Sequence, residues 1–285
     1  MAIIHLSDLH LRSDSGAETN RRFDRLCDRL LSDEFSAEDI VAITGDLIDS
    51  AWDDGSMRVA ASAIGRLRGK FGGRIVIAPG NHDYGNGLGG DSRFIEQFFS
   101  AFALYLCSDS PIPRHDYLAD AGPFASPFPV VRQIGDTLLI ALDSMEEELC
   151  SVSRPDPGFN FGAEGELGKR QLRALQRLLA DPRVNGSKVV VCLHHHPFRN
   201  MLIANRFRDA EQFCAVLRNS GRRIDALLFG HNHHFQDVSD EAAKHAVRLA
   251  LEGDSLKDAR DDKCSFRRID LFAIEPAYCI KRIEA

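Results

Sequence analysis

Short apolar runs alternate with amphipathic stretches along most of the chain, which is typical of an α/β protein. Each apolar run has the length of a buried strand, and each amphipathic stretch carries one apolar stripe at helical spacing. We expect strands at 2–6, 40–44, 74–78, 188–193 and 224–229. We expect helices over or within 23–31, 56–70, 93–105, 166–180 and 210–217.

The middle of the chain is less regular. Residues 130–134 and 137–142 look like two strands, and Gly135-Asp136 between them predicts a hairpin. Residues 108–129 hold five of the eleven prolines, which predicts extended, turn-rich chain. Residues 84–90 and 146–161 are predicted to be loops. The last fifty residues show several β-like runs, and we expect a single domain over residues 1–285.

Composition and charge narrow the class of protein. Hydrophobic residues make up 44% and charged residues 27%, which is ordinary for a globular chain. The seven cysteines include no CxxC pair, which argues against a disulfide scaffold or a zinc ribbon. A net charge of -7 disfavours a dedicated duplex-binding protein. The start MAIIHLSDLHL does not look like a signal peptide and no apolar run suggests a membrane span, so we expect a cytoplasmic protein.

Polar residues follow the apolar runs where the predicted strands end. These clusters are Asp8 and His10, Gly45-Asp46, Gly80-Asn81-His82-Asp83, His194-His195-His196 and Gly230-His231-Asn232-His233. Ligand sites of α/β sheets form at that edge. Carboxylate oxygens and imidazole nitrogens suit Mn²⁺, Fe or Zn²⁺, and the set is large enough for two ions. Two ions about 3.5–4 Å apart form a clamp for phosphoryl displacement.

Together the clusters resemble the five sequence blocks of the calcineurin-like metallophosphoesterases. In the order of the family, the blocks are Asp8-x-His10, Gly45-Asp46-x-x-Asp49, Gly80-Asn81-His82-Asp83, His195-x-Pro197 and Gly230-His231-x-His233. Each block alone is common by chance, whereas the ordered set is specific. The resemblance implies a four-layer α/β/β/α sandwich, with two mixed β-sheets flanked by helices. It also implies a phosphoester hydrolase that uses two divalent ions, Mn²⁺ or Fe²⁺, with Zn²⁺ as a further option.

The resemblance also implies a role for each block residue. The ligands of the first ion would be Asp8, His10, Asp46 and His233. The ligands of the second ion would be the bridging Asp46, Asn81, His195 and His231. His82 would contact the phosphate and stabilise or protonate the leaving oxygen, with Asp83 as its tuning partner. A metal-activated water would attack phosphorus in line.

The fourth block offers three successive histidines. The family pattern places the ligand two residues before proline, which selects His195, and strand alternation would then turn His194 to the opposite face. His196 could line the pocket. Asp49 stands where purple acid phosphatases place a tyrosine ligand, so their iron centre is not expected. Asp49 is either a partner behind the ligands or a turn residue.

The metal blocks do not specify the substrate. The single compact domain, the N-terminal Asp8 block and Gly165-x-x-Gly168-x-x-Gln171-Leu172 are similar to the bacterial class III cyclic-nucleotide phosphodiesterases. We therefore expect a phosphodiesterase that acts on a cyclic nucleotide or a related small diester. The expected partner is this small phosphoester, without a stable nucleic-acid complex. The oligomeric state stays open, with a dimer among the options.

Three alternatives remain. One is a lipid-precursor pyrophosphatase similar to the UDP-diacylglucosamine hydrolases, whose acyl groove could come from phenylalanines at helical spacing, although core packing explains them more simply. These residues are Phe94, Phe98, Phe99 and Phe102. The second is a nuclease, which the acidic charge disfavours. The third is a non-catalytic scaffold, against which the intact metal blocks and His82 argue.

Overall fold

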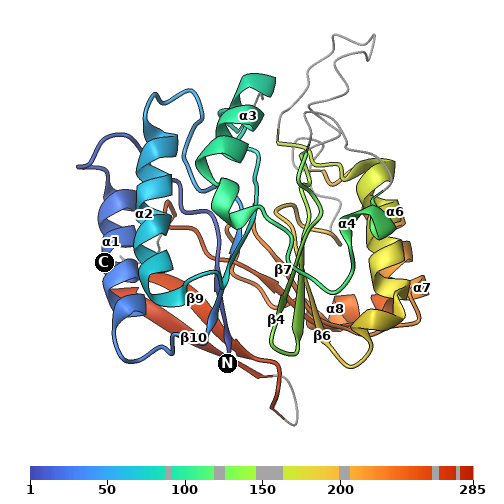
Figure 1. Cartoon of the computed structure of the whole chain (residues 1–285). Helices are drawn as coiled ribbons and strands as arrows, with labels where there is room; N and C mark the ends of the chain where they lie inside the picture. Colours follow the sequence, from blue (N-terminus) through green and yellow to red (C-terminus); the bar gives the residue numbers. More distant parts are fainter. Residues whose placement is uncertain are drawn as a thin grey trace.

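Two five-stranded β-sheets lie between two layers of helices in the computed structural model (Figure 1). The structure describes residues 1–87, 91–118, 126–145, 163–198, 206–258, 263–273 and 277–284. The first sheet has the order β10-β9-β1-β2-β3 and the second has the order β4-β5-β6-β7-β8. This architecture confirms the predicted four-layer α/β/β/α sandwich.

Both sheets are mixed. The strands of the first sheet are β1 (Ile3–Leu6), β2 (Ile40–Thr44), β3 (Ile75–Ala78), β9 (Lys263–Asp270) and β10 (Ala277–Glu284). Those of the second are β4 (Val130–Ile134), β5 (Thr137–Ala141), β6 (Lys188–Cys192), β7 (Ile224–Phe229) and β8 (Val247–Glu252). β1, β2 and β3 run parallel, as do β5 to β8, while β4, β9 and β10 pair antiparallel to their neighbours. Pairing of Ile134 with Thr137 confirms the predicted hairpin.

Helices cover the outer face of each sheet (Figure 1). The helices are α1 (Glu18–Leu31), α2 (Ser56–Phe71), α3 (Ser92–Ala101), α4 (Arg114–Tyr117), α6 (Gly168–Ala180), α7 (Ala210–Asn219) and α8 (Ser239–Ala242). α1 and α2 lie on the side of the first sheet, and α6 and α7 lie on the side of the second. Among the described helices, none has both the length and the apolar character needed to cross a bilayer.

β5 to β8 of the second sheet are largely buried on both faces, and alternate residues enter different cores. On β6, Val190 and Cys192 join the core shared with the first sheet, whereas Val189 and Val191 join the core beneath α6 and α7. This follows from the two-residue period of a strand. Even-numbered residues of β6 therefore face the first sheet.

The irregular middle differs from its prediction in two places. The short helix α4 lies inside the proline-rich stretch that we expected to be extended. Tyr84, expected in a flexible loop, is buried and donates a hydrogen bond from its hydroxyl to Asp143 Oδ2 (2.8 Å). Residues 88–90 of that loop and the whole of the predicted loop 146–161 lie outside the described residues.

Candidate metal centre

The candidate site forms where loops following β1, β2, β3, β6 and β7 meet. Backbone hydrogen bonds extend the strand pairing into these loops, because Asp8 N donates to Gly45 O (3.0 Å) and His10 N donates to Asp46 O (2.9 Å). Gly230 N likewise donates to His194 O (2.9 Å). The polar side chains after the strands are thus brought to one edge of both sheets, as parallel strands predict.

Five polar residues of these loops have a left-handed backbone. They are Asp8 (φ 50°), His10 (φ 47°), Asp46 (φ 51°), His231 (φ 80°) and His233 (φ 58°). This conformation is uncommon for residues other than glycine and costs on the order of 1–3 kcal/mol each. Such strain persists where the surroundings enforce it, and it gathers at functional sites. The left-handed backbone therefore falls on five of the seven predicted ligands, and not on Asn81 or His195.

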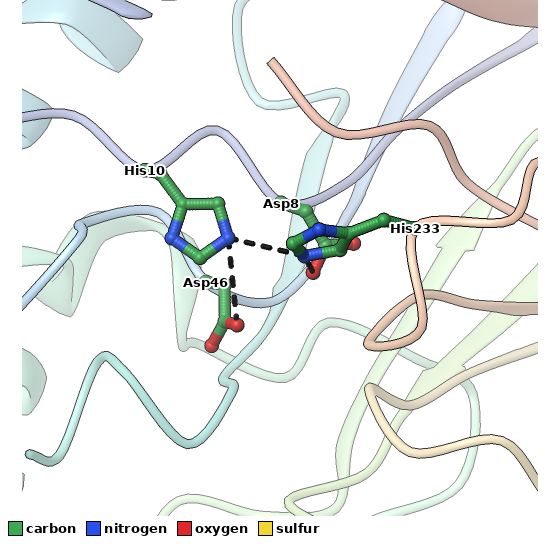
Figure 2. A group of neighbouring side chains, drawn as sticks. All are labelled: Asp8, His10, Asp46 and His233. Carbon is green, nitrogen blue, oxygen red and sulfur yellow. Dashed lines mark hydrogen bonds and ion pairs between the residues drawn. The ribbon is translucent and has the colours of Figure 1, made fainter. Parts of the chain in front are cut away.

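Asp8, His10, Asp46 and His233 form a first cluster (Figure 2). Each offers one oxygen or nitrogen, and these atoms lie within 4.8 Å of one another. His10 Nε2 lies 3.2 Å from His233 Nε2 and 3.9 Å from Asp46 Oδ2. His233 Nε2 lies 3.2 Å from Asp8 Oδ1. Ligand atoms around one ion at about 2.1 Å lie roughly 3.0–3.4 Å apart, so most of these spacings fit a shared cation.

Asp46 also belongs to a second cluster, together with Asn81, His194 and His231. His194 Nε2 lies 3.0 Å from Asn81 Oδ1 and 3.4 Å from Asp46 Oδ2. His231 Nδ1 lies 3.1 Å from Asn81 Oδ1 and 3.2 Å from His194 Nε2. A carboxylate oxygen, an amide oxygen and two imidazole nitrogens are suitable donors for a second divalent ion. The Asp46 carboxylate is common to both clusters.

The buried carboxylates give the centre a negative field. Burial opposes ionisation of Asp8, but the charge and hydrogen bond of His233 together with the charge of His194 lower the pKa of Asp8 to about 2. Against burial, Asp8 raises the pKa of His233 to about 10 and Asp46 raises the pKa of His194 to about 9. The centre therefore favours positive charge. Divalent cations would supply this charge on displacing the imidazole protons.

Hydrogen bonds behind the imidazoles keep their inward nitrogens available as ligands. His194 Nδ1 donates to the carbonyl oxygen of Thr44 (2.8 Å), which leaves the lone pair on Nε2 facing Asp46. Asp49 Oδ1 lies 3.4 Å from the Nδ1 atom of His10. The structure thus places Asp49 behind a candidate ligand, which is one of the two roles left open by the sequence.

The chain matches one known protein family over most of its length. A family model described as calcineurin-like phosphoesterase matches residues 1–235. The chain belongs to the calcineurin-like phosphoesterase family. No curated protein sequence matches it significantly.

Solved structures resemble this phosphoesterase at low sequence identity. A dimetal phosphatase from Danio rerio superposes with a TM-score of 0.63 at 13% identity, covering 100% of this chain and 98% of that chain. A phosphopantetheinyl hydrolase from Mycobacterium tuberculosis gives 0.49 at 13% identity, covering 90% of each chain. A protein serine/threonine phosphatase from Saccharomyces cerevisiae gives 0.41 at 12%, covering 100% of this chain and 80% of that chain. At such identities the likeness of the first structure concerns the fold alone.

In the fourth block of this phosphoesterase, the structure contradicts the predicted choice of ligand. His194, which we expected to face away, points into the second cluster, and the predicted ligand His195 does not. His195 Nε2 donates to the carbonyl oxygen of Ala163 (3.1 Å), and its Nδ1 accepts from the hydroxyl of Ser144 (2.7 Å). Both ring nitrogens of His195 are therefore used by the protein itself.

Strand geometry explains the exchange. Even-numbered residues of β6 face the first sheet, which supplies Asp46 and Asn81, and His194 continues that face beyond the strand. His194 and His195 do lie on opposite faces, as alternation predicts. The family spacing, however, placed His195 rather than His194 on the face toward the first sheet. His196 is buried against Phe229, with ring centroids 4.7 Å apart, and is not among the residues that line the cleft described below.

The expected pairing of Asp83 with His82 is also not observed. The Asp83 carboxylate accepts hydrogen bonds from backbone N–H groups, and these donors are Leu47 (2.8 Å), Ile48 (3.3 Å) and Gly80 (2.8 Å). Asp83 therefore ties the loop after β2 to the loop after β3. His82 Nδ1 instead donates to the carbonyl oxygen of Asp49 (2.5 Å).

His82 stands in a cleft beside both clusters. The cleft has a volume of about 300 Å³ and is lined by Asp46, Asn81, His82, Asn86, Gly87, Ala163, His231 and His233. His82 Nε2 lies 4.0 Å from Asp46 Oδ2. A Cβ atom on Gly87 would lie only 2.4 Å from this nitrogen, and the φ of Gly87 is +86°. Glycine at that position leaves room for the imidazole.

The structure brings a residue that lies after the fifth block to the centre, and this residue was not predicted. Asp258 forms a short ion pair with His233 Nδ1. The sequence does contain a signal for Asp258. Residues 253–258 follow an apolar run, just as the polar residues of the five blocks follow theirs.

Proposed function

We propose that this chain is a dinuclear metal-dependent phosphodiesterase that acts on a small diester, with cyclic nucleotides as the leading substrate class. The observation that carries the proposal is the Asp46 carboxylate shared by two clusters of ligand atoms. Such sharing suits a pair of ions that clamp a phosphoryl group. The ligands of the first ion are Asp8, His10, Asp46 and His233. The ligands of the second ion are Asp46, Asn81, His194 and His231.

Two divalent ions, Mn²⁺, Fe²⁺ or Zn²⁺, would supply Lewis acidity at the phosphate when bound to these residues, and would lower the pKa of a water so that it could attack phosphorus near neutral pH. The chain contributes the fixed positions of the ligands and the shape of the cleft. Left-handed loops and hydrogen bonds behind the imidazoles hold those ligands before substrate arrives. The substrate phosphate then enters a site that needs little reorganisation.

His82 is the group placed to move a proton. Donation from Nδ1 to the carbonyl oxygen of Asp49 fixes the ring and keeps Nε2 in the cleft. When His82 is protonated, its Nε2–H group donates a hydrogen bond to an oxygen of the phosphate and then transfers its proton to the departing oxygen. This is general acid catalysis, and its value grows as the leaving group becomes more basic.

We expect His82→Ala to lower kcat about 100-fold or more on a diester with a poor leaving group, because general acid catalysis contributes roughly 10²–10⁴-fold. The loss should be smaller on bis-p-nitrophenyl phosphate, whose leaving group needs little protonation. Steady-state kinetics on both substrates, with metal content measured in parallel, tests this. His115→Ala, which changes a histidine with 84% of its side chain exposed, is the control. Equal losses on both substrates would argue against the acid role.

Several observations favour a small diester over the alternatives. The cleft volume of about 300 Å³ lies at the lower end of the range for small-molecule sites. Phe98 and Phe102 are buried in the core and Phe99 packs against it, so these rings offer no groove for acyl chains. Three of the four phenylalanines that suggested an acyl groove are thus used in core packing, which counts against the lipid-precursor alternative. The acidic charge still disfavours a nuclease.

Purified protein should hydrolyse bis-p-nitrophenyl phosphate with Mn²⁺, and a chelator should abolish the reaction. A panel of cyclic nucleotides, UDP-diacylglucosamine and single-stranded nucleic acid then identifies the substrate class, with the highest kcat/KM expected on a cyclic nucleotide. Activity that persists in excess chelator, or no turnover of any phosphoester, would contradict the hydrolase. Preference for the lipid diphosphate would move the assignment to the pyrophosphatase.

A further inference from the structure

A segment outside the five blocks lies against the first cluster. Ser255–Asp258 follows β8, beyond the region 1–235 that the family model matches. Its backbone docks on the loop after β1, because Leu256 N donates to the carbonyl oxygen of Asp8 (3.0 Å) and the hydroxyl of Ser255 donates to the same oxygen (3.3 Å). Arg22 of α1 donates to the carbonyl oxygen of Leu256 (2.7 Å) and is a further contact that holds the segment.

The side chain of Asp258 reaches the back of a candidate ligand. Its carboxylate forms a short ion pair with His233 Nδ1, while His233 Nε2 faces Asp8 Oδ1 at 3.2 Å. A neutral imidazole carries one N–H and one lone pair. A carboxylate that accepts the N–H at Nδ1 leaves the lone pair at Nε2, on the side of the cluster.

Lys257 acts on the other imidazole of the first cluster through Asp49. Lys257 Nζ lies 2.9 Å from Asp49 Oδ1, and Arg12 Nη2 lies 2.7 Å from Asp49 Oδ2. The same Asp49 Oδ1 is 3.4 Å from His10 Nδ1. The positively charged side chains of Lys257 and Arg12 therefore hold the Asp49 carboxylate behind His10, as Asp258 lies behind His233.

We propose that Ser255–Asp258 is a positioning element for the first ion, in which Asp258 fixes the tautomer and orientation of His233 and Lys257 steadies the carboxylate behind His10. The inference rests on the two-ion centre of the proposed function. It adds a part of the chain that lies outside the family blocks. Asp258 touches neither substrate nor ion and works through His233 alone.

Asp258→Ala should weaken binding of the first ion about 10–100-fold, which is the usual effect of removing a partner behind a metal-bound histidine. Asp258→Asn keeps an oxygen that accepts from Nδ1–H, so it should recover part of the affinity. Lys257→Gln should cost less, because Arg12 still holds Asp49. The matched controls are Asp240→Ala and Lys244→Gln, which change exposed residues near α8. Asp258 is 59% exposed, so we expect the metal-free variants to unfold at the wild-type temperature.

The measurement is calorimetric titration of metal-free chain with Mn²⁺, together with anomalous diffraction from crystals equilibrated at limiting Mn²⁺. Selective loss at the position beside His233, with partial recovery in Asp258→Asn, is the expected result. Unchanged occupancy in Asp258→Ala, or equal losses at both positions, would contradict the positioning role while leaving the hydrolase intact. A wild-type chain that binds no ion pair would contradict both proposals.

Discussion

Asp46→Asn should lower kcat/KM by at least about 1,000-fold and leave fewer than one ion per chain at Mn²⁺ concentrations that saturate the wild type. The reason lies in the two carboxylate oxygens. Oδ1 accepts from the backbone N–H of His82 (2.9 Å), a contact that asparagine can keep. Oδ2 faces His10 Nε2 at 3.9 Å and His194 Nε2 at 3.4 Å, and an amide nitrogen placed there cannot bind cations.

Metal analysis after dialysis and kinetics on bis-p-nitrophenyl phosphate measure the two effects of Asp46→Asn. Asp33→Asn, at an exposed position before β2, controls for the loss of one negative charge. Asparagine preserves the shape of the side chain, so the fold of the metal-free chain should persist, and circular dichroism checks this. Two retained ions with near wild-type turnover would show that Asp46 bridges nothing, and the shared centre would be abandoned.

Much of the fold could be predicted because its signals are local. The strands at 40–44 and 224–229 have the predicted bounds, since buried strands are read directly from short β-branched and aliphatic runs. Gly135-Asp136 predicted the hairpin through turn chemistry alone. α4 was not predicted, because the many prolines of this stretch indicated extended chain rather than the single helical turn that follows Pro113. Tyr84 was missed because glycines in its loop hid a buried contact with Asp143, which is 59 residues away.

Most residues of the candidate site could be predicted from the sequence, but the orientation of every side chain could not. The five blocks predicted seven metal ligands, and the structure places six of them in the two clusters. The choice in the fourth block went wrong because β6 is apolar on both faces, so no local pattern reveals which face meets the first sheet. Asp83 was misplaced for a similar reason, since its partners are backbone N–H groups without sequence signatures. Packing between the sheets decides the first orientation, and contact between the loops after β2 and β3 of the first sheet decides the second.

His194→Ala and His195→Ala should separate a ligand from its supporting neighbour. We expect His194→Ala to lose the second ion, keep most of the first and lower kcat/KM about 100–1,000-fold, because one of four donors to that ion is removed. His195→Ala should keep both ions, since its nitrogens bond to Ser144 and Ala163 instead. It should lower the free energy of unfolding by about 1–3 kcal/mol, because buried hydrogen-bonding groups lose their partner.

Metal content, anomalous peaks and denaturant unfolding of the two variants give independent readouts. Each variant is a control for the other, because the residues are adjacent, equally buried and identical in chemistry. Loss of the second ion in His195→Ala alone would restore the family spacing of two residues before proline. The hydrogen bonds of His195 would then have to break when ions bind, and the carbonyl oxygen of Ala163 at the cleft wall would have to find another donor. Such a rearrangement would cost binding energy, whereas His194 already presents Nε2 to Asp46 and Asn81.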